Sequence, residues 1–479
     1  MIVRRHSRAV MARGALLVLA ALATLGSARA SEPPRLASAL ADHAVLQRDR
    51  PIVIEGSAAP GARLTVTLGD QTAVAVTDAS GRWRATLPAR AATADPLTLR
   101  VRDAAGQSAE ARDLLIGDVW LCSGQSNMEL QVVRALDSYN QIAAAGDGAL
   151  RLATVPRMTA ATPLDHLPSP LAWAAAAPAS VSDFSAVCYY MARALRTRTK
   201  VPIGAIAASW GGTPIKSWLD PVAVAGVVGP RAPSAPTADP TGQTSQTGLL
   251  YNGMIAPLGA FGLSGIAWYQ GESDVGHPGY RDRLAAMIGG WRRQFGRPDL
   301  PLLVVGLANY GKMPTDPDDS ATAALREEQR QFVLHDAHSA LITTIDLGER
   351  GDVHPADKQQ VGRRLSRAAV AALLGNSGVQ GPSPTRAYRR NGAIRVDFAQ
   401  VTGALHAWSA SDALAFELCG PVGTACRFAR ATAQGSTVTI IDDAGPVSRV
   451  RYAWADSPIV NLYDDNALPP APFEIAVAP

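Results

Sequence analysis

A serine lies at the kind of junction where nucleophilic catalysts are found. Ser126 follows the apolar run 119–122 and precedes a helix-compatible run, 129–136. A tight turn between a strand and a helix exposes the hydroxyl, and the unpaired N–H groups of the helix start favour negative charge beside it. The local sequence is not a Gly-x-Ser-x-Gly elbow, and serine is also common at helix N-caps for structural reasons. Ser126 is therefore a candidate nucleophile that needs support from the rest of the chain.

The best candidate for a general base is His354. Asp352 precedes it by two residues, and Pro355 biases its backbone towards an extended conformation. If the extension includes Asp352, both side chains point to one side and the carboxylate can hold the imidazole N–H. The alternative is a surface loop with an ordinary Asp-x-His. His277 is the second candidate base.

Other polar segments follow predicted strands. The segment 209–213 contains Gly211 and Gly212, which leave backbone N–H groups accessible to a ligand. Gln270 and Glu272 follow the apolar run 263–269. The carboxyl ends of parallel strands meet at one edge of a sheet, so these groups should gather near Ser126. A hydroxyl, an imidazole, a carboxylate and N–H donors are the parts that a serine esterase needs.

The elements that must position these groups follow two patterns. From 36 to 116, strands of about five residues alternate with turn signals, which indicates an antiparallel β-sandwich. After Gly117, continuous apolar strands alternate with helical runs, which predicts a parallel sheet with both faces covered. The predicted strands are 119–122, 203–209, 263–269, 302–307 and 341–345, and the predicted helices are 184–198, 280–295, 321–334 and 358–374.

The N-terminal end of the chain is predicted to be a leader segment and the C-terminal end a β domain. Arg4, Arg5, Arg8 and Arg13 precede the apolar run 15–25, and small residues end it, so 1–30 is predicted to be a secretory signal peptide cleaved after Ala30. Short strands return after Gly375. The expected parts are the signal peptide 1–30, a β-sandwich 31–116, a catalytic domain 117–376 and a β domain 377–479, which packs with the N-terminal β segment or stands alone.

Charge and cysteine content restrict the function further. Without 1–30 the chain has 40 Lys and Arg against 41 Asp and Glu, so nothing points to nucleic acid. No later stretch is long enough to span a membrane, so we expect a periplasmic or secreted protein.

Cys419 and Cys426 are typical of a small disulfide loop, whereas Cys122 and Cys188 either pair or are free and buried. No Cys/His cluster suggests a metal, and the oligomeric state stays open.

Several blocks match one family in the same order along the chain. They are 119–129, 209–214, 268–273 and 352–355 leading to 362–365, with further matches at 42–48, 250–255 and 452–456. The chain resembles the sialate O-acetylesterase-like carbohydrate esterases of the SGNH hydrolase superfamily. The resemblance implies an α/β fold, with an SGNH-type three-layer parallel sheet in the catalytic domain and antiparallel β segments on either side. It implies no cofactor.

The resemblance also assigns roles to residues. It implies Ser126 as the nucleophile and His354 as the general base. The oxyanion donors would be the Ser126 N–H, a backbone N–H at Gly211 or Gly212, and the side-chain amide of Gln270. The residues expected to contact substrate are Asn252, Trp210, Trp268 and Tyr269, the aromatic ones by stacking on sugar rings if they are not simply core residues.

The acid that orients His354 has two candidates. The superfamily usually places two residues between Asp and His in its last block, whereas one separates Asp352 from His354. Some related carbohydrate esterases use the Glu of the Gln-Gly-Glu block, which is Glu272 here. The sequence favours Asp352 slightly and leaves Glu272 as the alternative.

The expected reaction is removal of O-acetyl groups from carbohydrates through an acetyl-serine. The substrate is an O-acetyl sialic acid or an acetylated plant hemicellulose such as xylan or xyloglucan. Two other functions stay open: a non-catalytic carbohydrate-binding protein on the same scaffold, and a serine peptidase.

Overall fold

The parallel strands predicted after Gly117 form the centre of one large sheet. The computed structural model describes residues 32–228, 246–376, 378–421, 425–442 and 446–478, so the predicted signal peptide lies outside the described residues. The main path of the sheet has the order β10-β9-β11-β8-β12-β13-β14-β15. The strands are β8 (Ser108–Gly124), β9 (Asp147–Thr154), β10 (Ala174–Ala176), β11 (Ile203–Ser209), β12 (Gly265–Tyr269), β13 (Leu302–Val305), β14 (Ser339–Ile342) and β15 (Gly378–Gln380).

The complete burial of the central strands agrees with the continuous apolar runs from which they were predicted. Every residue of β12, β13 and β14 is buried, as expected for strands covered on both faces. Apart from β10, which pairs antiparallel with β9, the neighbours along this path run parallel. The carboxyl ends of β8, β11 and β12 therefore lie at one edge, which is where the candidate catalytic segments begin.

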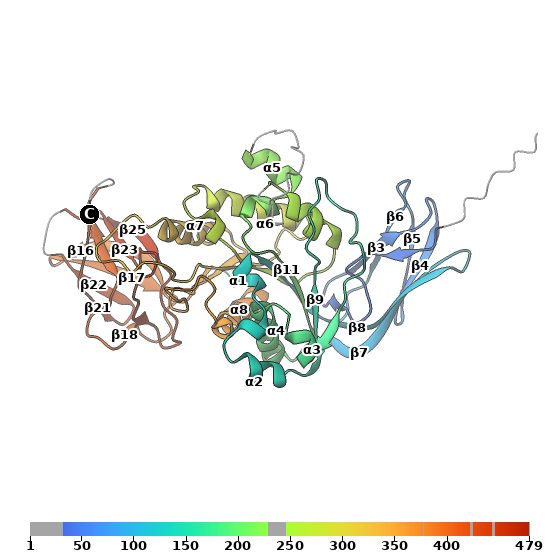
Figure 1. The fold of residues 1–479 in the computed structure, drawn as a ribbon, viewed down its shortest axis with the longest axis horizontal. Helices are drawn as coiled ribbons and strands as arrows, with labels where there is room; N and C mark the ends of the chain where they lie inside the picture. Colours follow the sequence, from blue (N-terminus) through green and yellow to red (C-terminus); the bar gives the residue numbers. More distant parts are fainter. Residues whose placement is uncertain (1–31, 229–245, 377, 422–424, 443–445, 479) are drawn as a thin grey trace, which may run out of the picture. The chain divides into compact units, whose positions relative to one another are not determined.

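Helices lie on both sides of this sheet, as Figure 1 shows for α6 and α7 above the central strands and α4 and α8 below them. Helices α4 and α8 pack on each other, and α4 contacts β11 while α8 contacts β13 and β14. The four long helices confirm the predicted ones: α4 (Ala186–Thr199), α6 (Tyr280–Gln294), α7 (Ala321–His335) and α8 (Lys358–Leu373). Shorter helices are α1 (Ser126–Glu129), α2 (Ser138–Ala143), α3 (Pro178–Val181), α5 (Pro221–Val228), the 3₁₀ turns Val132–Arg134, Ile215–Trp218, Ala256–Leu258 and Glu272–Asp274, and the π-helix Tyr251–Ile255.

The N-terminal strands are joined to the central sheet through one long strand. β8 pairs antiparallel with β7 as far as Ile116 and parallel with β11 from Asp118 onward, so the boundary predicted between 116 and 117 falls inside a continuous strand. A separate sheet has the order β1-β3-β6. The N-terminal strands are β1 (Arg35–Leu36), β2 (Val45–Gln47), β3 (Ile52–Ser57), β4 (Arg63–Leu68), β5 (Gln71–Val76), β6 (Arg82–Leu87) and β7 (Thr93–Asp103).

The C-terminal strands have a sheet and a hydrophobic core of their own. The larger sheet has the order β20-β19-β23-β25-β16-β17-β22-β21, and its core includes Phe416, Val450 and Phe473. The strands are β16 (Ser383–Arg390), β17 (Ala393–Ala399), β18 (His406–Ala407), β19 (Phe416–Cys419), β20 (Cys426–Phe428), β21 (Ala431–Gln434), β22 (Thr437–Ile441), β23 (Arg449–Tyr452), β24 (Leu462–Tyr463) and β25 (Phe473–Ala478).

Two disulfides join elements of the fold. The predicted bond between Cys419 and Cys426 is confirmed and links β19 to β20. Cys122 and Cys188, for which the sequence left two possibilities, also form a disulfide. It ties β8, which leads to Ser126, to helix α4.

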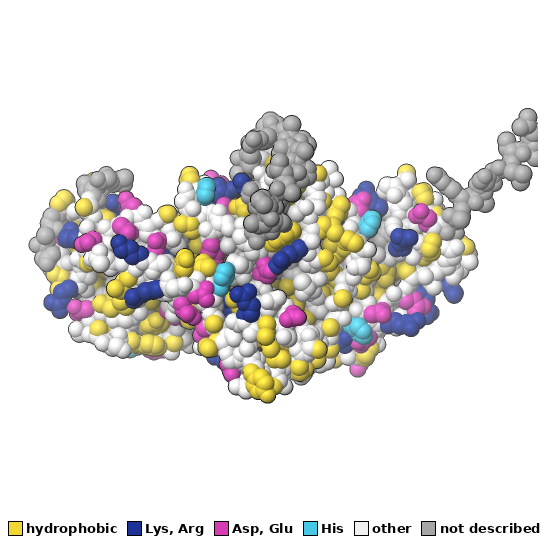
Figure 2. Space-filling view, in the orientation of Figure 1, with side chains coloured by type: hydrophobic (Ala, Val, Ile, Leu, Met, Phe, Trp, Pro, Cys, Tyr) yellow, Lys and Arg dark blue, Asp and Glu magenta, His cyan; other side chains and the backbone are white. Residues whose placement is uncertain are grey.

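The described surface matches the balanced charge of the sequence. Figure 2 shows basic and acidic side chains interspersed over the visible face. Among the described residues, no helix is both long enough and apolar enough to cross a bilayer.

Candidate active site

Ser126 lies where β8 ends and α1 begins. A Cβ at Gly124 would collide with the backbone of Tyr269 on β12, so only glycine allows this close approach of the two strands. The Gln125 N–H donates to the Tyr269 carbonyl oxygen at 3.1 Å. Ser126 is the first residue of α1 and is half-buried. The predicted turn between a strand and a helix is therefore present, although the helix has a single turn.

The glycine pair predicted to supply N–H donors lies against Ser126. A Cβ built on Gly211 would lie 3.2 Å from the Ser126 Cβ, so the two residues are in contact. The Gly211 N–H donates to the Glu129 carboxylate at 2.5 Å, and Glu129 forms an ion pair with Arg157. Gly212 follows, exposed, with a φ of +73°. The Gly211 N–H is therefore already used by a carboxylate, a partner that the sequence did not indicate.

Asn127 connects three segments that are distant in the sequence. Its side chain is 2% exposed, and its Nδ2 donates to Glu272 Oε1 at 2.5 Å and to the Val353 carbonyl oxygen at 2.9 Å. Its Oδ1 accepts a hydrogen bond from Lys358 Nζ at 2.5 Å. The residue after Ser126 is thus bonded directly to the residue before His354. The predicted nucleophile and the predicted base therefore lie on segments that are hydrogen-bonded to each other.

Sequence reasoning gave no role to Asn127 or to Lys358. Asn127 lies inside the block that carries the family resemblance, so that block was the available signal. Lys358 offered no signal, because a lysine in the first turn of a helix is typical of a solvated surface. In the structure its side chain is completely buried and its Nζ lies 5.4 Å from the centre of the Tyr269 ring. Burial lowers the pKa of Lys358 to about 8.

His354 is half-buried and has Asp352 beside it. Asp352 Oδ1 accepts the backbone N–H of His354 at 2.8 Å and lies 3.9 Å from its Nδ1, which is too long for a hydrogen bond to the ring. Burial lowers the pKa of His354, and the negative charge of Asp352 acts against this effect. The imidazole is therefore neutral at neutral pH, the form that can accept a proton.

Glu272, the other candidate acid, faces Asn127. Burial raises the pKa of Glu272, while the hydrogen bond from Asn127 and the charge of Lys358 oppose the rise. Its second oxygen, Oε2, is buried and has no hydrogen-bond partner among the described residues. Neither Asp352 nor Glu272 is hydrogen-bonded to the imidazole of His354 in the part of the chain that the structure describes. The choice between them stays a prediction.

Gln270 lies at the end of β12 and is fully buried. Its amide nitrogen lies 2.7 Å from Asp274 Oδ2 and also within hydrogen-bond distance of Gln125 Oε1, at 3.1 Å, and the Thr213 carbonyl oxygen, at 3.2 Å. Its Oε1 accepts the Tyr280 hydroxyl at 2.8 Å. Both amide hydrogens therefore have protein acceptors. To stabilise an oxyanion, Gln270 would have to exchange one of them.

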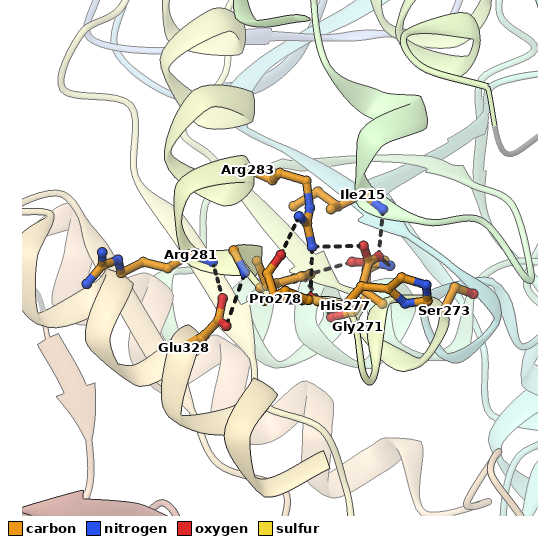
Figure 3. A network of polar contacts seen from close by, with 12 residues as sticks. Ile215, Gly271, Ser273, His277, Pro278, Arg281, Arg283 and Glu328 are labelled. Atoms are coloured by element: carbon orange, nitrogen blue, oxygen red, sulfur yellow. Dashed lines mark hydrogen bonds and ion pairs between the residues drawn. The ribbon is translucent and has the colours of Figure 1, made fainter. Parts of the chain in front are cut away.

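The loop after Gln270 is braced by a polar network. Asp274 Oδ2 accepts the Ile215 N–H at 2.8 Å, which fixes this loop against the segment after β11. Arg283 donates to the carbonyl oxygens of Pro278, at 2.8 Å, and His277, at 3.2 Å (Figure 3). His277, the second candidate base, is exposed and joins this network through its backbone. The network fixes the loop that follows Gln270.

The predicted substrate contacts are partly wrong. Trp268 and Tyr269 are completely buried, so neither ring can stack on a sugar. Side chains point alternately to the two faces of β12, and both faces are covered, so every side chain of this strand is buried. The position of Trp268 and Tyr269 beside the motifs does not reveal this burial. Asn252 is 4% exposed, and its amide donates to the Ala160 carbonyl oxygen at 3.1 Å, a bracing contact. Trp210 is half-buried, with the Arg157 guanidinium 5.8 Å from its ring centre, so its stacking role stays a prediction.

One cluster among the described residues has the composition of a metal site. Glu417, Cys419 and Cys426 place potential ligand atoms within 4.8 Å of one another. Both sulfur atoms are joined in the disulfide, so they are not the thiolates that bind metals.

Comparison with known proteins identifies the family of this chain. A family model described as carbohydrate esterase, sialic acid-specific acetylesterase, matches residues 116–371. The sialate O-acetylesterase of Homo sapiens is 29% identical over 489 residues, covering 92% of both chains, and that of Mus musculus is 29% identical over 515 residues, covering 92% of this chain and 94% of the other.

A solved structure agrees with the sequence matches. The crystal structure of a carbohydrate acetylesterase from Xanthomonas citri is similar with a TM-score of 0.83 and 36% identity, covering 92% of this chain and 99% of that chain. The chain is a carbohydrate esterase and hence a carboxylic ester hydrolase. More narrowly, it belongs to the family of sialic acid-specific acetylesterases that the matching model describes.

Proposed function

We propose that this chain is an exported serine esterase that removes O-acetyl groups from carbohydrates through an acetyl-serine intermediate. The observation that carries the proposal is the hydrogen bond from Asn127 to the Val353 carbonyl oxygen, because it holds the segment of Ser126 beside that of His354. The catalytic region 117–376 would have the SGNH-type three-layer arrangement, between β segments 31–116 and 377–479. Residues 1–30 would direct export and then be removed.

In the proposed mechanism, His354 removes the proton of Ser126 as the oxygen attacks the acetyl carbonyl carbon. The tetrahedral oxyanion is stabilised by the Ser126 N–H, a backbone N–H at Gly211 or Gly212, and the amide of Gln270. His354 then protonates the leaving sugar alcohol. Water, activated by the same imidazole, releases acetate and restores Ser126.

The Gln270 amide, and the Gly211 N–H if it rather than Gly212 serves the oxyanion, must change partners during the reaction. The Gly211 N–H is bonded to Glu129, and the Gln270 amide to Asp274. Loss of one oxyanion donor typically costs about 10²–10³ in rate. We expect Gln270→Ala to lower kcat by about that factor if its amide serves the oxyanion, and to act mainly on stability if it serves only the buried network.

The central test is the loss of hydrolysis in Ser126→Ala and His354→Ala with the fold intact. Both variants should release almost no acetate while retaining the urea midpoint of the parent protein. Ser273→Ala is a matched control, because it removes a neighbouring hydroxyl to which the mechanism gives no role. Rapid quenching should show an acetyl group on the peptide that contains Ser126. Full activity of Ser126→Ala would end the proposal.

The substrate class and the orienting acid need separate experiments. Acetate release from O-acetyl sialic acid, acetylated xylan and acetylated xyloglucan should identify the substrate. Release of acetate from p-nitrophenyl acetate, with no cleavage of amide substrates, separates an esterase from a binding protein and from a peptidase.

Asp352→Asn and Glu272→Gln should differ widely in kcat, and the larger loss identifies the orienting acid. Equal and small losses would exclude both residues.

A further inference from the structure

A pocket lies on the C-terminal strands. It has a volume of about 280 Å³ and is lined mainly by apolar side chains, among them Met313, Leu414, Phe428, Trp454 and Ile459. Phe428 is 46% exposed and Ile459 is 50% exposed, although both are large and apolar. No residue of the proposed catalytic site lines this pocket. A group of exposed apolar side chains around a hollow is typical of a ligand site.

Glu417 lines the same pocket and is unusual for a buried carboxyl group. On β19 it lies between Phe428 of β20 and Arg451 of β23. Its side chain is 2% exposed, and its buried oxygen Oε2 has no hydrogen-bond partner among the described residues. The guanidinium of Arg451 is used by other carboxylates, those of Asp319 at 3.0 Å and Glu474 at 2.6 Å.

A buried polar group without a partner carries a desolvation cost that a ligand can remove. Burial raises the pKa of Glu417 to about 8, so the group is protonated at neutral pH. A neutral carboxyl group both donates and accepts a hydrogen bond, which suits an alcohol.

Trp454 adds a second unused donor to the pocket. Its side chain is 8% exposed, and its indole N–H has no hydrogen-bond partner in the described part of the chain. The Arg451 guanidinium lies 4.5 Å from the ring centre. The pocket thus combines aromatic surface, a carboxyl group and an N–H donor. Aromatic faces pack on the C–H groups of a sugar ring, while the two polar groups can meet its hydroxyls.

We propose that this pocket binds a neutral sugar unit, separate from the acetylated unit held at Ser126. The choice of a sugar rests on the proposed action on carbohydrates. The surrounding charge favours a neutral sugar, because the negative charges of Asp318 and Asp319 act on Glu417, raising its pKa, and would disfavour an anionic sugar. The rim residue Asp412 is paired with Arg430 at 2.8 Å.

The position of the pocket suits a polymeric substrate. Met313 lies in the segment between β13 and α7, which leaves the parallel sheet at its carboxyl end. Ser126 follows β8 at the same end, since β8, β12 and β13 are parallel neighbours. The Asp456 carbonyl oxygen accepts the Tyr310 N–H at 3.2 Å, which joins this segment to the residues after Trp454. One carbohydrate chain can therefore be held at a sugar unit remote from its ester.

The test is direct binding to the Ser126→Ala protein, which cannot turn over substrate. Xylobiose and cellobiose serve as neutral probes and N-acetylneuraminic acid as an anionic one, with affinity measured by calorimetry. At least one neutral disaccharide should bind, and Phe428→Ala and Glu417→Leu should each weaken binding about tenfold or more. Tyr139→Ala is the control, because Tyr139 is 82% exposed and lies on α2, away from the pocket.

The outcomes separate this site from the proposed esterase function. Phe428→Ala in the active protein should leave hydrolysis of p-nitrophenyl acetate unchanged. Because Phe428 is at the surface, this variant keeps the test valid if Glu417→Leu does not fold. Absence of binding by both neutral probes, or binding that Phe428→Ala does not weaken, overturns the proposal even if acetate is released. Binding that Phe428→Ala weakens supports it even if no ester is hydrolysed.

Discussion

Replacing Asn127 by leucine should leave a buried ammonium group without its hydrogen-bond acceptor. Lys358 is completely buried, and its Nζ donates to Asn127 Oδ1 at 2.5 Å. Asn127→Leu removes that acceptor and also the two donors that serve Glu272 and Val353. Leaving a buried charged group without its hydrogen-bond partner typically costs about 3 kcal/mol or more, which is above the range for a neutral group. We expect Asn127→Leu to lower the free energy of unfolding by about that amount.

Removing the ammonium as well should recover part of this loss. Lys358→Met alone leaves Asn127 Oδ1 unsatisfied, which costs about 1–3 kcal/mol. In the double variant Asn127→Leu/Lys358→Met, the buried ammonium group is gone, and two apolar side chains pack beside the Glu272 carboxyl group. The double variant should therefore be less destabilised than the sum of the single variants, by about 1–3 kcal/mol.

Urea unfolding of the four proteins at pH 7, followed by tryptophan fluorescence, measures this coupling. Lys312→Met is the control, because it removes an exposed lysine. The kcat for p-nitrophenyl acetate should fall in Asn127→Leu, because the bond to Val353 no longer holds the His354 loop. If the single effects add within about 0.5 kcal/mol, the two side chains are not coupled and the reasoning is wrong.

Three further predictions concern pH and the disulfide. Because burial lowers the pKa of His354, the acid limb of the kcat/KM profile should have its midpoint below pH 6.5. Asp352→Asn should move this midpoint lower still, because the charge of Asp352 raises the pKa of His354. A midpoint above pH 6.5 would contradict the assignment of His354 as the general base. Replacing Cys122 and Cys188 by alanine opens a loop with a sequence separation of 66 residues and should lower the free energy of unfolding in urea by about 4 kcal/mol. An unchanged urea midpoint would show that the disulfide does not stabilise the fold. The pKa of Glu417 is raised from 4.5 to about 8, so its protonated form adds stability that is fully present below about pH 4.5 and is lost as the pH rises through about 8. The Tm difference between the parent and Glu417→Gln should follow that course, and a difference independent of pH would refute it.

Local patterns in the sequence were sufficient for most of the secondary structure. The helix predicted at 280–295 is observed as Tyr280–Gln294, and the strand predicted at 203–209 is observed with the same bounds. Periodicity and continuous apolar runs involve only residues that are close along the chain, so they can be read from the sequence without knowledge of the fold. The Cys419–Cys426 bond was also predictable, because its two ends are separated by seven residues.

The sequence by itself determined the family, the strand and helix pattern, and the order of the segments that contain Ser126 and His354. Only the tertiary structure decided which side chains meet, because the decisive contacts join distant residues. Lys358 reaches Asn127 across 231 positions, and the pairing of Cys122 with Cys188 depends on how α4 packs on the sheet. The burial of Trp268 has the same cause, since a strand with polar neighbours along the chain can still be covered on both faces.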